Sequence, residues 1–220
     1  MPAVTEPKKN LKEEILRVAE AMFCQYGYDA TTFQKIADEL HITKGSITYH
    51  FKNKHFIMGT LFEEYFAALR AHIDSFPDAY RDAYWRYSVM YIYAYRAIMA
   101  SPCTRGLFYH KNQMSLWEVT EVATMENIYR DIAEDFHKEF TEEDLRITAY
   151  LDLGARRRMY REYLTDSSFL PIDRYCYYHV YHMGLLARLD EATITRDIQD
   201  AFAFADAHTP PTVPILCGQP

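Results

Sequence analysis

The sequence has few glycines and none of the short motifs by which enzymes hold phosphate or build an oxyanion site. Only seven glycines occur among the 220 residues. No P-loop, G-x-G-x-x-G, G-x-S-x-G or H-E-x-x-H pattern is present, and no Cys, His and Asp residues have a usable catalytic spacing. These absences argue against an enzyme and predict no cofactor, although a helical enzyme with an unrecognised site remains an alternative.

Long hydrophobic runs are also missing. No stretch of about 18 or more apolar residues occurs, and the amino terminus lacks the apolar segment of a signal peptide. We therefore expect a cytoplasmic protein with no membrane partner. The four cysteines (Cys24, Cys103, Cys176 and Cys217) form no C-x-x-C pair. Their scatter favours free thiols in a reducing compartment over a disulfide or zinc framework.

The charge is unevenly distributed along the chain. The formal net charge is -7, but residues 1–60 hold eight Lys or Arg and seven Asp or Glu, which leaves that region at +1 and the remainder at -8. A near-neutral amino-terminal region beside an acidic body is compatible with a few local phosphate contacts. An excess of one charge is also what chance gives, so the signal is weak.

Hydrophobic spacing predicts an all-α fold of about nine helices, because no strand pattern occurs anywhere. Asn10 begins a first amphipathic helix that ends at Gly27. Thr32 and Thr43 are suitable N-caps for two short helices, and Asn53 for a longer fourth one. Helical patterns follow at about 80–99, 107–140 (divided or kinked near 115–117), 141–166, 173–189 and 192–208, with Pro102 and Gly106 as interruptions.

Residues 31–54 form the pattern of a helix, a tight turn and a second helix that exposes polar side chains. A helix-turn-helix places its second helix in the major groove of DNA. Hydroxyl groups, a cation and an aromatic ring can contact phosphates and base edges there. An exposed face of an unrelated helical hairpin fits the pattern about equally well. The candidate reading residues on the second helix are Lys44, Gly45, Ser46, Thr48, Tyr49 and His50.

The run from Ile15 to Ile57 resembles the DNA-binding domain of the TetR family of bacterial transcriptional regulators. That family joins a G-Y/F-x-x-T-T linker to an I-A motif and a K-G-x-x-Y-x-H-F-x-x-K ending. Eleven positions match this pattern as they stand: Gly27, Tyr28, Thr31, Thr32, Ile36, Ala37, Lys44, Gly45, His50, Phe51 and Lys54. Tyr49 keeps the second of the two aromatic positions that are usual on the reading helix. The resemblance implies that Thr31, Thr32 and Lys54 lie with the reading residues at the DNA surface, and that Thr32 and Lys54 bind phosphates.

Two positions depart from the family pattern. His41 stands where the turn usually has glycine, and we expect it to adopt a positive φ at a cost of roughly 1 kcal/mol. Thr48 replaces the first of two usual aromatic residues on the reading helix. The resemblance therefore implies the class of protein but not the operator sequence.

The resemblance further implies three parts: a helix-turn-helix domain at residues 1–54, a helical effector-binding and dimerisation domain at 55–208, and an extended tail at 209–220. The expected function is a ligand-responsive regulator, most simply a repressor, that binds a pseudo-palindromic double-stranded DNA operator as a homodimer through its two carboxy-terminal helices. A small-molecule effector of unknown class would release it. A constitutive DNA binder or an adaptor without effector response is the alternative.

Aromatic residues suggest where an effector binds. The chain has 19 Tyr and 13 Phe, and four tyrosines share one face of the helix at 80–99: Tyr84, Tyr87, Tyr91 and Tyr95. Such a stripe can line a pocket for a flat or cationic molecule, although it is more often part of the core. Arg86 and Arg96 would suit an anion if they turned inward.

Two further groups of residues have ordinary structural explanations. His179 and His182 stand one helical turn apart, but two histidines are more often packing or a surface pair than metal ligands, and we predict no metal site. Residues 156–158 are three consecutive arginines, which we interpret as a solvated turn of helix whose stems cover apolar surface.

Overall fold

The computed structural model describes residues 10–112, 118–166, 168 and 170–211. These residues form ten α-helices, one short 3-10 helix and no strand. None of these helices combines the length and the apolar character needed to cross a membrane. The elements are α1 (Leu11–Tyr26), α2 (Phe33–Glu39), α3 (Lys44–His50), α4 (Lys54–Asp74), η1 (Pro77–Ala79), α5 (Ala83–Ala100), α6 (Pro102–Asn112), α7 (Glu118–Asp135), α8 (Glu142–Thr165), α9 (Ile172–Leu186) and α10 (Glu191–Ala207).

The helix starts predicted from capping residues are confirmed. The side chains of Asn10, Thr32 and Thr43 accept hydrogen bonds from backbone N–H groups in the first turns of α1, α2 and α3. Asn53 caps α4 in the same way, and Thr141 forms the expected capping box with the third residue of α8. These bonds satisfy backbone donors that a helix start leaves unpaired.

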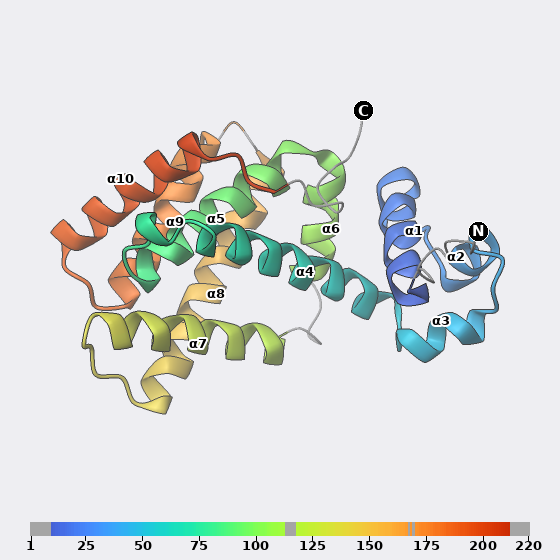
Figure 1. Ribbon diagram of the computed structural model, residues 1–220, viewed down its shortest axis with the longest axis horizontal. Helices are drawn as coiled ribbons and strands as arrows, with labels where there is room; N and C mark the ends of the chain where they lie inside the picture. Colours follow the sequence, from blue (N-terminus) through green and yellow to red (C-terminus); the bar gives the residue numbers. More distant parts are fainter. Residues whose placement is uncertain (1–9, 113–117, 167, 169, 212–220) are drawn as a thin grey trace, which may run out of the picture.

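The first three helices form a small domain with its own core. Ile15 of α1, Ile36 of α2 and Ile47 of α3 are fully buried, and Phe51 closes the domain below α3. His41 adopts φ 53° in the turn between α2 and α3, as the sequence predicts. Figure 1 shows this group at one end of the molecule, with α4 leading away from it into the larger helical body.

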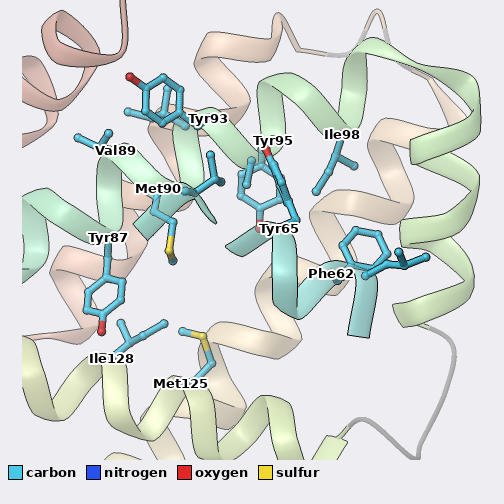
Figure 2. Close-up of a cluster of buried hydrophobic side chains, with 14 of the residues drawn as sticks. Phe62, Tyr65, Tyr87, Val89, Met90, Tyr93, Tyr95, Ile98, Met125 and Ile128 are labelled. Carbon is cyan, nitrogen blue, oxygen red and sulfur yellow. The ribbon is translucent and has the colours of Figure 1, made fainter. Parts of the chain in front are cut away.

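Helix α5 occupies the centre of the body. It packs against α4, α6, α7, α9 and α10, and nearly all of its side chains are buried. Figure 2 shows Tyr87 and Met90 of α5 pointing toward Ile128 and Met125 of α7. A helix that is apolar almost all round needs such complete cover, which explains its central position.

The boundary between α5 and α7 differs from the prediction. Pro102 begins α6 instead of separating two helices, and Gly106 lies inside α6. Proline fits the first turn of a helix because the N–H it lacks would be unpaired there anyway. The long helix expected at 107–140 is therefore two helices, α6 and α7, and the count rises from about nine to ten. The division expected near 115–117 falls outside the described residues, as does most of the extended tail expected at 209–220.

The interpretation of the cysteines as free thiols is wrong for one pair. Cys24 of α1 and Cys103 of α6 form a disulfide, with their Cα atoms 5.1 Å apart. Their separation of 79 residues conceals this pairing, since only the packing of α6 against α1 brings the two together. Cys176 is a buried free thiol, and burial raises its pKa to about 12.

Candidate DNA interface and effector cavity

The outer face of α3 is polar and open to solvent. Lys44, Thr48 and Tyr49 are exposed, and Tyr49 keeps 87% of its surface accessible although it is a large aromatic residue. His50 is half-buried and packs edge-to-face with the Tyr49 ring, with ring centroids 5.1 Å apart. Ile47 alone is fully buried and anchors α3 to the domain core. The helix therefore presents its polar residues outward as one surface.

Small residues at the start of α3 leave the backbone accessible. A Cβ built on Gly45 would meet only the Thr43 hydroxyl, at 3.5 Å. The Thr43 hydroxyl accepts from the Ser46 N–H at 3.1 Å, and the Thr48 hydroxyl donates to the Lys44 carbonyl at 2.9 Å. A DNA backbone could therefore approach this end closely.

Three predicted contacts lie at the edge of this surface or below it. Thr32 is exposed, but its hydroxyl caps α2 by accepting from the Lys35 N–H. Thr31 is fully buried, and its hydroxyl donates to the Gly27 carbonyl at 2.9 Å. Lys54 donates to the carbonyls of Tyr28 at 2.5 Å and Thr31 at 3.0 Å. Thr31 and Lys54 are thus engaged in holding the linker between α1 and α2.

Tyr28 connects the amino-terminal domain to the body, a role that sequence reasoning missed. Its hydroxyl shares a hydrogen bond with His55 Nδ1 of α4, and its ring stacks on His110 of α6 with centroids 4.9 Å apart. The Lys54 ammonium lies 4.1 Å from the centroid of the same ring. Burial and the neighbouring Lys54 charge lower the pKa of His55. Tyr28 was visible only as a match to the family pattern.

A cavity of about 540 Å³ lies in the body. Helices α4, α5, α6, α7 and α8 all contribute side chains to its wall, which is mainly aromatic and aliphatic. A volume of this size fits a small organic molecule. The lining residues are Gly59, Phe62, Glu63, Phe66, Ala67, Arg70, Ala71, Asp74, Met90, Tyr91, Tyr95, Phe108, Glu121, Thr124, Met125, Ile128, Leu153, Arg156, Arg157 and Tyr160.

Two of the four tyrosines predicted as effector contacts line this cavity. Tyr91 and Tyr95 are part of the wall and stack on one another with ring centroids 5.9 Å apart. Tyr84 is instead buried beside α9 and donates to the Val180 carbonyl at 2.8 Å. Tyr87 donates to Asp131 of α7 at 2.5 Å. The four tyrosines do not share one environment, because different neighbours cover the two halves of α5.

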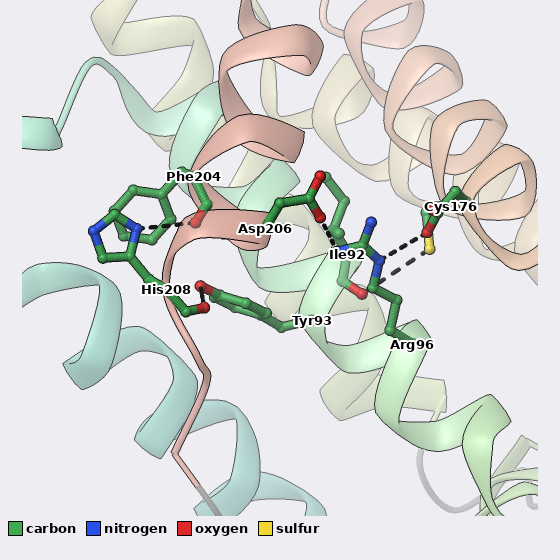
Figure 3. A network of polar contacts seen from close by, with 8 residues as sticks. Ile92, Tyr93, Arg96, Cys176, Phe204, Asp206 and His208 are labelled. Atoms are coloured by element: carbon green, nitrogen blue, oxygen red, sulfur yellow. Dashed lines mark hydrogen bonds and ion pairs between the residues drawn. The ribbon is translucent and has the colours of Figure 1, made fainter.

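The two arginines of α5 do not line the cavity. Arg86 pairs with Asp131 of α7 at 3.3 Å. Arg96 pairs with Asp173 of α9 and Asp206 of α10, each at 2.7 Å. Figure 3 shows Arg96 directed toward Asp206. Both side chains tie helices of the body together.

The interpretation of residues 156–158 as a solvated turn is wrong for Arg156. This residue is 7% exposed, lines the cavity and pairs through Nε with Asp152 at 2.7 Å. Burial alone would raise the pKa of Asp152, but the Arg156 charge, with hydrogen bonds from neighbouring groups, lowers it to about 2. The signal was present in the sequence, since an acidic residue four positions before an arginine can pair with it inside a helix.

The two histidines of α9 have separate surroundings. His179 is buried and packs against Tyr95 and Tyr175, with ring centroids 4.6 and 4.3 Å apart. Burial lowers its pKa well below the usual value. His182 Nδ1 lies 3.5 Å from Asp152. In the described part of the chain, no group of three or more His, Cys, Asp and Glu residues is placed to hold a metal ion.

The amino-terminal domain defines the class of protein as a helix-turn-helix DNA binder, since a capped second helix presents a polar, solvent-open face. Residues 15–58 match the sequence model of the bacterial regulatory proteins of the tetR family. Over this stretch, about a fifth of its length, the chain is similar to the DNA-binding domain of the tetR family. Members of that family are DNA-binding transcription factors and not enzymes.

Curated relatives match this chain over short stretches. The HTH-type transcriptional regulator QacR of Staphylococcus aureus is 47% identical over 45 residues, which cover 20% of this chain and 24% of that protein. A protein described as "Probable acrEF/envCD operon repressor", from Escherichia coli K12, is 42% identical over 43 residues, or 20% of each chain. The matched stretch thus spans about a fifth to a quarter of the length of these relatives.

The whole fold also has solved counterparts. The TetR regulator TylP of Streptomyces fradiae superposes with a TM-score of 0.52 at 16% sequence identity, over 91% of this chain and 99% of that chain. At this identity the likeness concerns the fold alone. The body thus shares its helical architecture with that regulator.

Proposed function

We propose that this protein is a ligand-responsive transcriptional repressor that binds a pseudo-palindromic operator as a homodimer and is released by a small molecule in the body. The observation that carries this proposal is the course of α4. Its first turn holds the DNA-binding domain through Lys54 and His55, and its later turns form one wall of the cavity with Phe62 and Phe66. One rigid helix therefore touches both sites.

The DNA-reading surface is the exposed face of α3. Tyr49 and His50 extend from its carboxy-terminal half, and Lys44 supplies a cation for a phosphate at its start. Thr48 stands beside Tyr49 and can contact a thymine methyl group or a phosphate. The names of the relatives, which include an operon repressor, support repression rather than activation.

Coupling between the cavity and α3 has two routes. The first is α4, as above. The second is α6, which contributes Phe108 to the cavity wall and stacks His110 on Tyr28 of the DNA-binding domain. A ligand that displaces either helix would move α3 relative to its counterpart in the dimer, so that the two no longer match the spacing of the half-sites.

The dimer is proposed because one recognition helix reads too few base pairs to be specific alone. The resemblance to the family implies an interface on the last two helices, α9 and α10. The large exposed apolar side chains in the body favour α9 with α8: Tyr178 and Leu185 lie on α9, and Ile147, Tyr150 and Leu151 on α8. None of the large exposed apolar side chains in the described residues lies on α10. We therefore include α8 in the proposed interface.

The first prediction tests the DNA-reading surface. Selection from a pool of random duplexes should yield a two-fold symmetric site for the unaltered protein. Tyr49→Ala should then weaken binding to that site by about 1 to 3 kcal/mol, because its exposed ring touches DNA. His50→Ala should act in the same direction. Fluorescence anisotropy at fixed salt measures the affinities.

The control is Tyr109→Ala, which removes an exposed tyrosine from α6 of the body. It should leave DNA affinity unchanged, and light scattering should give the same dimer mass for all variants. Equal losses from Tyr49→Ala and Tyr109→Ala would mean that α3 does not read DNA. Failure of the unaltered protein to enrich any sequence would overturn the proposed function itself.

The alternative of a constitutive DNA binder predicts a different result. In that case no small molecule that occupies the cavity would change operator affinity. The cavity of about 540 Å³ beside α4 favours the responsive protein, because a constitutive binder has no need to keep such a space.

A further inference from the structure

We propose that the cavity takes an uncharged organic molecule, largely aromatic or alicyclic, whose carbonyl or ether oxygen accepts a hydrogen bond from Arg156. This inference deepens the proposed effector response by assigning a ligand chemistry to the same cavity. It is carried by the surroundings of Arg156, by the aromatic wall and by the balance of charges around the cavity.

The wall of the cavity selects an apolar body. Six aromatic side chains and several aliphatic ones form most of it, from five helices that meet around the space. Ring faces and edges of this kind pack well against other flat rings. The aromatic residues are Phe62, Phe66, Tyr91, Tyr95, Phe108 and Tyr160.

Arg156 supplies a hydrogen-bond donor that no described protein group uses. Its Nε donates to Asp152 at 2.7 Å and its Nη1 to the Tyr95 hydroxyl at 3.3 Å, while the guanidinium lies 4.1 Å from the centroid of the Tyr91 ring. Its Nη2 is shielded from bulk solvent and has no hydrogen-bond partner among the described residues. An unpartnered buried donor is costly, so a ligand oxygen that a small rotation of the guanidinium brings within reach of Nη2 would gain a strong bond there.

The charges around Arg156 determine the charge of that ligand. Asp152 is fully buried and ionised, so it already neutralises Arg156. The neighbouring cation, Arg157, pairs with Glu121 at 2.9 Å. A ligand carboxylate would add an unbalanced negative charge near Asp152, and an ammonium group would face Arg156. At this end of the cavity, either charge would be buried beside groups that already have counterions, which is expensive in a low-dielectric site.

The exposed residues of α4 that line the cavity also disfavour large anions. Glu63, Arg70 and Asp74 lie there, two acidic groups against one basic group. This balance disfavours phosphate esters and other multiply charged anions. A neutral molecule with one accepting oxygen satisfies both the exposed side and the buried side of the cavity.

The test compares four molecules that share one skeleton: biphenyl, 4-acetylbiphenyl, biphenyl-4-carboxylate and protonated 4-(aminomethyl)biphenyl. Equilibrium dialysis at pH 7.5 with the full chain gives their affinities. We expect 4-acetylbiphenyl to bind about 10-fold tighter than biphenyl, because a hydrogen bond to a charged donor contributes that much. The carboxylate and the ammonium compound should both bind more weakly than 4-acetylbiphenyl.

A variant tests the donor directly. Arg156→Lys keeps a positive charge beside Asp152 but removes Nη2, so it should abolish the affinity advantage of 4-acetylbiphenyl over biphenyl. Arg158→Lys is the matched control, since Arg158 lies on the same helix, is exposed and pairs with Glu162. That variant should preserve the advantage. If Arg156→Lys does not fold, the order of the four affinities in the unaltered protein still decides.

Three results would overturn the proposal: tightest binding of the carboxylate or of the ammonium compound, equal binding of biphenyl and 4-acetylbiphenyl, or equal weakening of both by Arg156→Lys. Equal binding of biphenyl and 4-acetylbiphenyl would mean that Nη2 makes no hydrogen bond to the ligand. The effector response is judged separately, by adding 4-acetylbiphenyl to the operator complex. Binding in the expected order without release of DNA would refute the response and leave the ligand chemistry intact.

Discussion

Glu20 is a carboxyl group buried in the DNA-binding domain. It lies on the inner side of α1 and is 7% exposed. Burial raises its pKa to about 7 from a reference value of 4.5. As the pH rises from about 4.5 to 7, the unfolded chain releases this proton while the folded protein still holds it. The folded state therefore loses stability across that window, and the loss is complete above pH 7.

Glu20→Gln should consequently stabilise the protein at pH 8 by about 2 to 3 kcal/mol, because it removes the cost of a buried charge. At pH 4 the difference should vanish, since the glutamate is then protonated in both states. Urea unfolding at the two pH values measures it, with the exposed Glu64→Gln as control. A gain of equal size at pH 4 and pH 8 would show that ionisation of Glu20 is not the cause.

Single residues were predictable where their backbone chemistry is local. The caps and the positive φ of His41 depend on a few neighbouring residues, so the sequence alone indicates them. Arg156 was misjudged because its burial depends on the packing of α7 over α8 and on Tyr91 and Tyr95 of α5, which no local pattern reveals. The inward direction of Lys54 is likewise a tertiary property, since its partners lie more than 20 residues away.

At the scale of elements, α9 approaches α5 and α10 very closely at Gly184. A Cβ built there would lie 2.7 Å from the Ile194 side chain and 2.8 Å from the Tyr84 hydroxyl. Tyr84 is fully buried and held by its bond to the Val180 carbonyl, so it has little room to move. The absence of a side chain at Gly184 therefore sets the spacing of three helices.

Gly184→Ala should lower the free energy of unfolding by about 1 to 3 kcal/mol through overpacking. Gly106→Ala on α6 is the matched control, because a Cβ there meets nothing within 4 Å. That control should raise stability by up to about 1 kcal/mol through better helix propensity. Urea unfolding compares the two. A stabilising effect of both substitutions would mean that α9 can shift without cost.

Elements were predicted well wherever hydrophobic spacing and a capping residue agreed, as for α1 to α4 and α8. The start of α6 was predicted poorly because a proline such as Pro102 is compatible both with a break between helices and with the first turn of a new helix. The cavity could not be located, since it needs five helices in their final places. Of the four tyrosines proposed as effector contacts, Tyr91 and Tyr95 reach the cavity, while Tyr84 and Tyr87 pack elsewhere.

At the scale of the whole molecule, the DNA-binding domain is joined to the body by more than the continuous chain. Tyr28 contacts both α4 and α6, and the Cys24–Cys103 disulfide links α1 to α6 covalently. Both connections meet on α6, the helix that also contributes Phe108 to the cavity wall. The disulfide therefore restrains the route by which the cavity is proposed to act on α3.

The double variant Cys24→Ser and Cys103→Ser should lower the free energy of unfolding by about 4 kcal/mol. A cross-link between residues 79 apart removes that much loop-closure entropy from the unfolded chain. Urea unfolding without reductant measures the loss, and dithiothreitol should bring the unaltered protein to the same midpoint.

Cys176→Ser is unsuitable as a control because that thiol is fully buried. The control is instead the double variant itself in dithiothreitol, which should not respond. Identical unfolding of both proteins without reductant, or a free-thiol assay that finds Cys24 and Cys103 unpaired, would mean that the two domains are held together by packing alone.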